Sequence, residues 1–249
     1  MKPLVELVDI KKTYQTKYEE TEAIKGFSLN IVRGDFISIV GPSGCGKSTV
    51  LSIIAGLTEP SGGSVKFLND SITIGYMPQK DELFSWRSIY KNAVLGLEIQ
   101  HKLTPEHLIY VEYLMKAYGL QEFKNAYPSQ LSGGMRQRAA LIRTLALKPD
   151  ILLLDEPFSA LDYQTRLTVS DDIRSIIARE EKTAVLVTHD LSEAISLSDK
   201  VAVMSARPSV LKRIYDISLP KSASGHERRL MNDFAGYFDA IWKDIDKNE

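Results

Sequence analysis

Residues 41 to 49 read Gly41-Pro42-Ser43-Gly44-Cys45-Gly46-Lys47-Ser48-Thr49, and this stretch decides the fold. The apolar run at residues 36–40 predicts a buried strand before it, and residues 48–55 predict a helix that Gly56 ends. A glycine, four residues and then Gly-Lys-Ser between a strand and a helix is the phosphate-loop pattern. The alternative is a flexible glycine turn with an incidental lysine, and the complete pattern in this setting argues against it.

The residue types of this loop suit a polyphosphate. Its three glycines let the backbone turn tightly, so that successive N–H groups point at the phosphates. The N-terminus of the following helix adds a partial positive charge. We expect Lys47 to bridge the β- and γ-phosphates and the Ser48 hydroxyl to be a magnesium ligand. The stretch therefore predicts a nucleotide site.

Composition narrows the remaining possibilities. The 249 residues suffice for one large α/β domain, or for one with an inserted subdomain. The net charge of −1 argues against a broad basic surface, so no nucleic-acid partner is expected. Cys45 is the only cysteine, which excludes a disulfide within the chain, and inside the loop it is better interpreted as a small filler than as a catalytic thiol. The first ten residues do not resemble a secretory signal, and no apolar run approaches membrane-spanning length.

The first third of the chain predicts strands around the loop. Residues 4–10 and 26–32 read as two strands, the second with clean alternation of apolar and polar residues. The polar residues 11–22 are expected to form a connection between them. Residues 64–67 and 72–77 predict two further short strands.

The middle of the chain changes to helical spacing. From about residue 81 to residue 147 the apolar residues recur at helical intervals. Thr104-Pro105 predicts the start of a helix that Gly119 ends, and residues 133–147 predict another. This block is a candidate subdomain set between strands.

Strand and helix then alternate. Residues 151–154 are apolar without alternation, which is typical of a central parallel strand. Helices at 163–179 and 191–198 and strands at 184–187 and 200–204 follow, so we expect a parallel sheet with right-handed crossovers. In the tail, a terminal helix packed on the body is expected from apolar residues at helical spacing: Leu230, Phe234, Tyr237, Phe238, Ile241 and Trp242.

Two further motifs suggest chemistry. The strand at 151–154 ends in Asp155 and Glu156; Asp155 is suited to hold magnesium, and Glu156 to orient a water that attacks the γ-phosphate. The alternative is a pair of solvated acids before a turn, which the phosphate loop in the same chain disfavours.

Leu131-Ser132-Gly133-Gly134-Met135 offers a second anion site at a helix start. Taken alone, an ordinary glycine-opened helix is the better interpretation of that segment.

Taken together, these motifs resemble the ATPase subunit of ATP-binding cassette (ABC) transporters over residues 4–219. The family's parts occur in order as residues 41–49, the glutamine of Tyr76-Met77-Pro78-Gln79, the signature Leu131–Met135, the acidic strand 151–156, Ser159-Ala160-Leu161-Asp162, and the histidine of Val187-Thr188-His189-Asp190.

The resemblance implies an α/β fold: a P-loop NTPase (RecA-like) core with a parallel-rich sheet, a small antiparallel β part and an inserted α-helical subdomain. The core is expected at residues 1–80 and 150–220, the helical subdomain with the signature at 81–149, and a C-terminal helical tail at 221–249.

It also implies ATP and Mg²⁺ as cofactors and a homodimer that sandwiches two ATP molecules head to tail. Each phosphate loop would face the Ser132–Gly134 segment of the other copy, with Asp162 at the subunit contact. Glu156, His189 and Gln79 are the expected catalytic residues, and Ser48, Gln79 and Asp155 the expected metal ligands. Tyr14 is expected to stack on adenine, with Tyr18 as its rival.

Subfamily features favour an importer. Met135-Arg136-Gln137-Arg138, residues 83–87 and Asn92-Ala93 resemble nitrate, sulfonate and taurine importers, although residues 65–79 are shorter than in most of them. The expected function is to power import of a small solute through separate permease subunits at the cytoplasmic face of the membrane, with a solute-binding protein as an indirect partner.

Two other functions stay open: an exporter or lipid-trafficking ATPase, and a soluble DNA-repair or translation ATPase, which typically has a coiled-coil insertion or a second cassette.

Phe84 and Trp86 are expected to bind a cytoplasmic helix of a permease subunit. The alternative is that both aromatic residues belong to the core.

Overall fold

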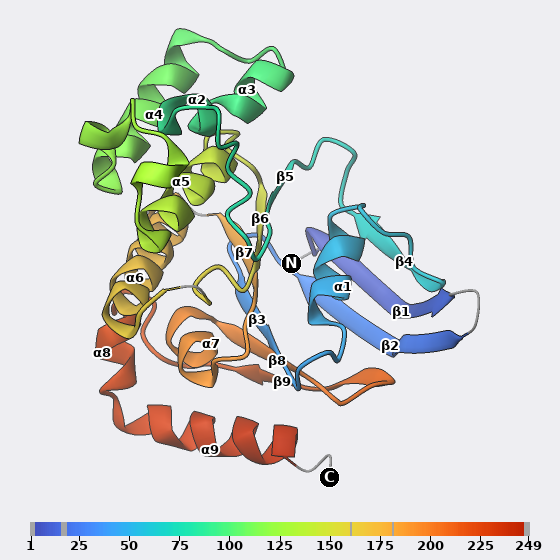
Figure 1. The fold of residues 1–249 in the computed structure, drawn as a ribbon. Coiled ribbons are helices and arrows are strands. Elements are labelled where there is room, and N and C mark those ends of the chain that lie inside the picture. The colour runs from blue at the N-terminus through green and yellow to red at the C-terminus, as the bar shows by residue number, and fades with distance from the viewer. Residues whose placement is uncertain (1–2, 16–18, 160, 181, 247–249) are drawn as a thin grey trace.

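The computed structural model describes residues 3–15, 19–159, 161–180 and 182–246. Its centre is a mixed sheet with the strand order β4-β1-β2-β9-β8-β3-β7-β6-β5 (Figure 1). The strands are β1 Val5–Gln15, β2 Glu20–Ile31, β3 Phe36–Val40, β4 Gly62–Phe67, β5 Ile74–Met77, β6 Ile151–Asp155, β7 Thr183–Val187, β8 Lys200–Met204 and β9 Ser209–Asp216. The helices are α1 Lys47–Ile54, α2 Ile89–Ala93, α3 Leu95–Ile99, α4 Pro105–Ala117, α5 Gly133–Leu145, α6 Tyr163–Arg179, α7 Leu191–Leu197, α8 Gly225–Arg229 and α9 Asn232–Asp246, with 3-10 turns η1 Gln121–Phe123 and η2 Pro128–Gln130.

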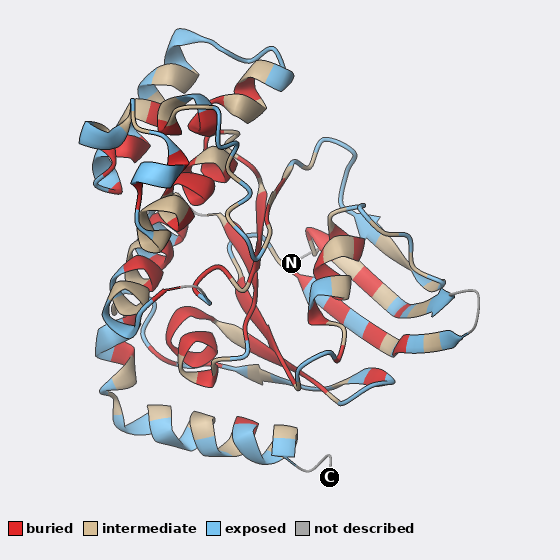
Figure 2. Cartoon of the chain, in the orientation of Figure 1, coloured by how far each residue is buried: buried red, intermediate tan, exposed pale blue. Residues whose placement is uncertain are grey.

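The strands β8, β3, β7, β6 and β5 form the parallel part of the sheet. Every residue of β3, β6 and β7 is buried, because elements cover both faces of a central parallel strand. Figure 2 shows this buried centre. The predicted parallel sheet is therefore confirmed, and the carboxyl ends of these strands meet at one edge.

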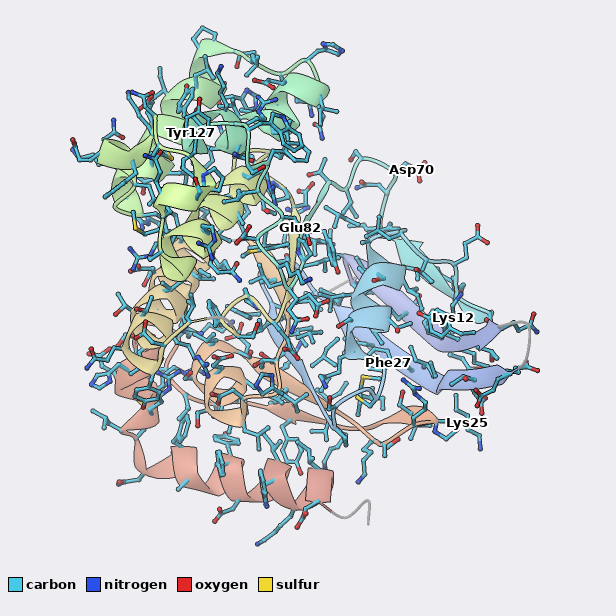
Figure 3. All side chains as sticks on the ribbon, in the orientation of Figure 1. Lys12, Lys25, Phe27, Asp70, Glu82 and Tyr127 are labelled. Carbon is cyan, nitrogen blue, oxygen red and sulfur yellow. The ribbon has the colours of Figure 1, made fainter. Side chains whose placement is uncertain are left out.

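The antiparallel part differs from the expectation at residues 11–22. The residues 11–15 and 20–22 belong to strands instead, since β1 continues to Gln15 and β2 begins at Glu20, with Tyr14 opposite Thr21. Polar residues are tolerated there because an antiparallel pair can expose one face to water. On the inner face, Phe27 lies below α1 and packs in one apolar cluster with residues of that helix (Figure 3).

The strand β9 is absent from the sequence-based expectations. It pairs antiparallel with β8 and parallel with β2, and so joins the two parts of the sheet. Its apolar residues Val210, Leu211, Ile214 and Tyr215 come in adjacent pairs. A half-buried strand is recognised by alternation, and this segment has none.

The helices α2 to α5 form a lobe at one end of the molecule (Figure 1). Thr104 caps α4 as expected by accepting a hydrogen bond from the His107 N–H, and Gly119 ends the helix with a φ of +68°. The helix α5 ends at Leu145, two residues before the predicted end. Glu82 lies where this lobe meets the sheet (Figure 3).

The C-terminal segment forms two helices rather than one. Ile241 of α9 is fully buried, and Phe234, Tyr237 and Phe238 pack around it as expected. Leu230 and Trp242 were expected on the same buried face, and both expectations are wrong. Leu230 lies between α8 and α9 and is 73% exposed, because the break in the helix removes it from the face of α9. Trp242 directly follows Ile241, which turns its side chain away from the body and leaves it 53% exposed.

Two buried arginines fasten this segment to the end of α7. Arg228 donates hydrogen bonds to the carbonyls of Ser196 and Ser198 at 3.0 and 2.9 Å. Arg174 of α6 donates to the Leu197 carbonyl and, at 3.4 Å, to that of Ala223. The last carbonyls of a helix have no partner within the helix, so the arginines satisfy them. Burial, and then the neighbouring Arg174, lowers the pKa of Arg228 to about 10.

We predict that Arg228→Met destabilises the protein. The substitution leaves two buried carbonyls without donors, and the free energy of unfolding should fall by about 2–4 kcal/mol. Urea unfolding followed by circular dichroism measures it. Arg229→Met is the matched control, because the Nε and Nη1 atoms of Arg229 have no hydrogen-bond partner within the described residues. Equal stability of the two variants would contradict the anchoring role.

Candidate active site

The phosphate loop closes around the ammonium group of Lys47. This residue opens α1 and is buried, and its Nζ atom donates hydrogen bonds to the carbonyls of Gly41 and Pro42, both at 2.9 Å. Gly46 precedes the helix with a φ of +105°, which disfavours any side chain. A Cβ atom at Gly41 would lie 2.8 Å from the Met204 carbonyl oxygen. The loop therefore needs glycine at both positions to place the lysine at the helix N-terminus.

Cys45 is fully enclosed by this loop. Burial raises the pKa of its thiol. Reactive cysteines are partly exposed and have a lowered pKa, so these surroundings support the interpretation of Cys45 as a filler.

Asp155 and Ser48 meet beside the loop. The Ser48 hydroxyl donates to Asp155 Oδ1 at 2.9 Å, and the Tyr76 hydroxyl donates to Oδ2 at 3.3 Å. Burial of the carboxyl group raises the pKa of Asp155. A carboxylate and a hydroxyl are oxygen ligands of the kind that Mg²⁺ prefers, so this pair fits the ion. The sequence reasoning gave Tyr76 no role, and only the fold shows that β5 brings it to Asp155.

Three residues from separate motifs meet at one carboxylate oxygen. Glu156 Oε2 accepts a hydrogen bond from Gln79 Nε2 at 2.9 Å and lies 3.3 Å from His189 Nδ1. Glu156 has a φ of +45°, a strained value for a residue with a side chain. Its backbone N–H donates to the Val187 carbonyl at 2.9 Å, which holds that conformation at the end of the sheet.

Tyr14 lies beside the phosphate loop. Its hydroxyl is 3.2 Å from Thr49 Oγ1, and the Lys12 ammonium is 5.1 Å from the centre of its ring. The side chain is 43% exposed, so part of the ring is open to a ligand. Tyr18, the alternative, lies outside the described residues.

The signature segment, residues 131–135, lies at the start of α5. Ser132 caps α5 by accepting a hydrogen bond from the Met135 N–H at 3.3 Å. A Cβ atom at Gly134 would lie 2.8 Å from Thr165 Cγ2, so packing against α6 requires this glycine. Among the described residues, no hydrogen bond or ion pair joins residues 131–135 to residues 41–49. Leu131 is buried at the start of the helix.

Asp162 caps the next helix. Its carboxylate accepts a hydrogen bond from the Thr165 N–H at 3.0 Å. The side chain of Thr165, and then this N–H group, lower the pKa of Asp162. The side chain itself is exposed. The structure thus gives Asp162 a local role as a helix cap. Ala160, in the same motif, lies outside the described residues.

Phe84 and Trp86 are exposed, so the interpretation of both as core residues is wrong. They are 38% and 73% exposed, and their rings stack with centroids 4.8 Å apart. The buried Asn92 holds this loop. Its side chain accepts from the Phe84 N–H at 2.8 Å and donates to the carbonyls of Phe84, Arg87 and Ser88, each at 3.1 Å. A hollow next to the loop is lined by residues 79–83, Gly133, Arg136, Gln137 and Ser159.

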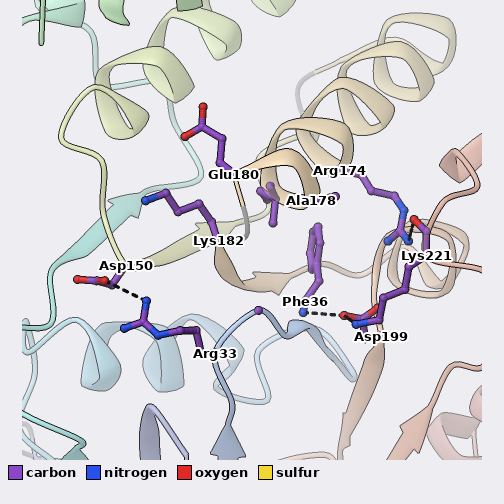
Figure 4. Close-up of a pocket in the computed structure, with 11 residues that line it drawn as sticks. Arg33, Phe36, Asp150, Arg174, Ala178, Glu180, Lys182, Asp199 and Lys221 are labelled. Carbon is purple, nitrogen blue, oxygen red and sulfur yellow. Dashed lines mark hydrogen bonds and ion pairs between the residues drawn. The ribbon is translucent and has the colours of Figure 1, made fainter. Parts of the chain in front are cut away.

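A second hollow lies at the opposite edge of the sheet (Figure 4). It is lined by the amino ends of the parallel strands, with Phe36 between Ala178 and Arg174. Two of its cations have acidic partners: Arg33 is 3.4 Å from Asp150, and Lys221 is 2.9 Å from Asp199. This hollow is remote from the strand ends that carry the predicted residues, and we do not assign the nucleotide to it.

No helix in the described part of the chain is both long and apolar enough to cross a membrane.

The family model described as ABC transporter matches residues 24–159. The chain is 45% identical to an uncharacterized ABC transporter ATP-binding protein, YtlC, of Bacillus subtilis, with 96% of this chain and 95% of that protein covered. It is 37% identical to the nitrate import ATP-binding protein NrtD of a Synechocystis species, with 87% of this chain and 83% of NrtD covered.

Similarity to an aliphatic sulfonates import ATP-binding protein, SsuB of Bacillus cereus, is 34% identity over 87% of each chain. Among solved structures, the dimeric post-hydrolysis state of the ATP-binding cassette MJ0796 bound to ADP and Pi matches with a TM-score of 0.76 and 32% identity. That match covers 87% of this chain and 100% of the other. The similarity confirms the P-loop NTPase fold that the motifs implied. The chain therefore belongs to the ABC transporter family, as an ATP-binding subunit that hydrolyses ATP.

Proposed function

We propose that this ATPase powers the import of a small solute of the nitrate or sulfonate kind through separate permease subunits. The observation that carries the catalytic part is the meeting of Gln79, Glu156 and His189 beside the Ser48–Asp155 pair. The similarity to NrtD and SsuB supports import. Residues 1–80 and 150–220 would be the nucleotide-binding core, 81–149 the helical subdomain and 221–249 the tail.

Within the proposed site, each residue has a distinct task. Lys47 and the N–H groups of residues 41–49 would hold the phosphates, and Ser48, Asp155 and Gln79 would hold Mg²⁺, which neutralises phosphate charge when bound. Glu156 would take a proton from the attacking water, since its carboxylate is fixed at the strand end. His189, with its Nδ1 atom 3.3 Å from Glu156, would contact the γ-phosphate.

The proposed active form is a head-to-tail homodimer. Within the described residues, the signature segment makes no hydrogen bond or ion pair with the phosphate loop of its own chain, and Ser132 is exposed at the start of α5. A helix N-terminus with exposed donors suits a phosphate brought by another copy. The dimeric MJ0796 structures support the association of two copies. Asp162, exposed at the start of α6, would lie at this contact.

The proposed permease contact is the loop that carries Phe84 and Trp86. Large aromatic residues that stack on each other and stay exposed are typical of protein interfaces. The adjacent hollow at residues 79–83 would receive a helix of the permease. Because Gln79 lines this hollow and also donates to Glu156, a bound permease would have a short route to the catalytic carboxylate.

We predict that Glu156→Gln separates ATP binding from hydrolysis. A positioned base contributes on the order of 10²–10⁴ in rate, so hydrolysis should fall by that factor while binding persists. The variant should form dimers with MgATP and remain monomeric with MgADP, because ATP held between two chains stabilises the dimer by mass action. Sedimentation velocity with each nucleotide measures this.

Glu112→Gln on α4 is the matched control, since Glu112 lies in the helical lobe and pairs with Lys124 at 3.5 Å. It should hydrolyse ATP at the wild-type rate. Normal hydrolysis by Glu156→Gln would remove Glu156 from the mechanism. Monomers under saturating MgATP would contradict the head-to-tail dimer.

For adenine, we predict that Tyr14→Ala weakens ATP binding about tenfold or more, because stacking on a base contributes roughly 1–3 kcal/mol. Tyr14→Phe keeps the ring and loses only the hydroxyl near Thr49, and should bind almost normally. Tyr18→Ala should also bind normally. Fluorescence titration measures the dissociation constants. Unchanged affinity in Tyr14→Ala, or a large loss in Tyr18→Ala, would reject Tyr14 as the stacking residue.

For the permease contact, we predict that Trp86→Ser reduces solute uptake by reconstituted vesicles at least tenfold and leaves the ATPase rate of the isolated chain within about twofold. An apolar anchor at the centre of an interface often contributes about 2 kcal/mol or more. Trp242→Ser is the matched control, because Trp242 is also exposed but lies on α9. Equal uptake by the two variants would place the permease contact elsewhere.

A further inference from the structure

Arg166 contacts two segments that the proposed function treats separately. It lies in the first turns of α6 and is partly buried. Its Nη2 atom donates to the carbonyl of Leu161 at 3.2 Å, one residue before Asp162, which would touch the second subunit. Its Nη1 atom donates to Asp190 Oδ2 at 3.5 Å, directly after His189. One guanidinium group therefore joins the subunit-contact segment to the histidine segment.

A buried carboxylate strengthens this connection. Glu193 Oε1 of α7 is 3.7 Å from Arg166 Nε, an atom that makes no hydrogen bond within the described part of the chain. The other oxygen, Oε2, accepts a hydrogen bond from the buried Thr188 hydroxyl at 2.7 Å. The Thr188 Oγ1 atom in turn accepts from the Asp190 N–H at 3.0 Å. Both neighbours of His189 in the sequence are thus held by the network that Arg166 enters.

The network ends at the proposed catalytic carboxylate. His189 itself is largely exposed, and its Nδ1 atom is 3.3 Å from Glu156 Oε2. An exposed imidazole has several rotamers open to it unless its backbone is fixed. Here the fixing contacts come from Thr188 and Asp190, and through them from Arg166 and Glu193. A shift of Leu161 and Asp162 would therefore reach His189 through Arg166.

We propose that Arg166 is a positioning residue for hydrolysis, which sets the orientation of His189 according to the position of the subunit-contact segment at Leu161. This inference rests on the roles proposed above for His189 and Asp162. Arg166 acts through the side chain of Asp190 on one side of His189 and, by way of Glu193, through Thr188 on the other. Hydrolysis would then be favoured only when the second subunit holds Leu161 and Asp162 in place.

The bonding geometry explains why an arginine is needed. A guanidinium group has five N–H donors in a fixed plane, and here they address a carbonyl and two carboxylates in three directions. A lysine carries the same charge as a single point and cannot reach all three. Misplacement of a reacting group by about 1 Å can cost on the order of 10²-fold in rate.

The test is steady-state ATP hydrolysis by Arg166→Met and Arg166→Lys. For both variants kcat should fall at least tenfold, while KM for MgATP changes less than about threefold, because the phosphate loop is untouched. The Arg166→Met/Glu193→Gln double variant should be no slower than the slower single variant, because the two residues act along one path. Additive losses would contradict the shared path.

Two controls separate this role from simple loss of structure. Arg174→Met removes a buried arginine of the same helix that binds carbonyls at the end of α7. It should lower the melting temperature and leave kcat of the folded protein unchanged. If Arg166→Met also lowers only the melting temperature, the positioning role is wrong. If His189→Ala hydrolyses ATP normally, the proposed role of His189 fails instead, which keeps the two failures distinguishable.

The pH profile gives an independent reading. Burial raises the pKa of Glu193 to about 6, and the nearby Asp190 carboxylate acts in the same direction. The hydrogen bond from Thr188 and the charges of Arg166 and His189 lower this pKa and only partly offset the rise. Below that pH the carboxyl group is neutral and its ion pair with Arg166 is lost. The ratio of wild-type kcat to Glu193→Gln kcat should therefore approach one below pH 5.5 and be higher above pH 6.5. The change in this ratio should extend over roughly one unit of pH around the midpoint. A ratio that does not change with pH would contradict the ion pair's part in the network.

Discussion

The alignment of three parallel strands at their carboxyl ends is the constraint on which the site depends. In the register of the sheet, Ile39 of β3 lies beside Val187 of β7, and Val187 lies beside Asp155 of β6. The chain leaves all three strands at the same level. Ile39, Val187 and Asp155 thus form one row across the sheet. The phosphate loop, His189 and Glu156 each follow this row by one or two residues, although they are far apart in the sequence. Burial of the strands on both faces favours this register, since a slip would disrupt the packing of the apolar side chains on each face.

The same alignment explains the electrostatics of the site. Asp155 is the last residue of a buried strand, so water is partly excluded from its carboxyl group and its pKa rises, while Ser48 and Tyr76 supply compensating hydrogen bonds. Glu156, one residue later, is turned by its positive φ toward Gln79 and His189. Two adjacent acids thus have different surroundings, which supports the different roles proposed for them.

Much of this arrangement could be predicted from the sequence, and the failures have physical causes. The strands β3, β6 and β7 and the loop at 41–49 were predictable because fully apolar runs and glycine spacing are local signals. The strand β9 was not, because its pairing with β2 and β8 depends on neighbours distant in the sequence. The network of Arg166 was missed for the same reason. No sequence pattern links Asp190 and Glu193 to Arg166. Only the packing of α6 against α7 brings the three side chains together.

The central proposal is that each ATP site is built from the phosphate loop of one chain and the signature segment of another. Mixing two inactive variants, Lys47→Ala and Ser132→Arg, tests it most directly by their combined ATPase rate. In a head-to-tail dimer the mixed species has one site with both defects and one site with neither, so activity should appear on mixing. Each variant should be inactive alone, and circular dichroism should show both to be folded. A mixture as inactive as its separate components would contradict the shared site.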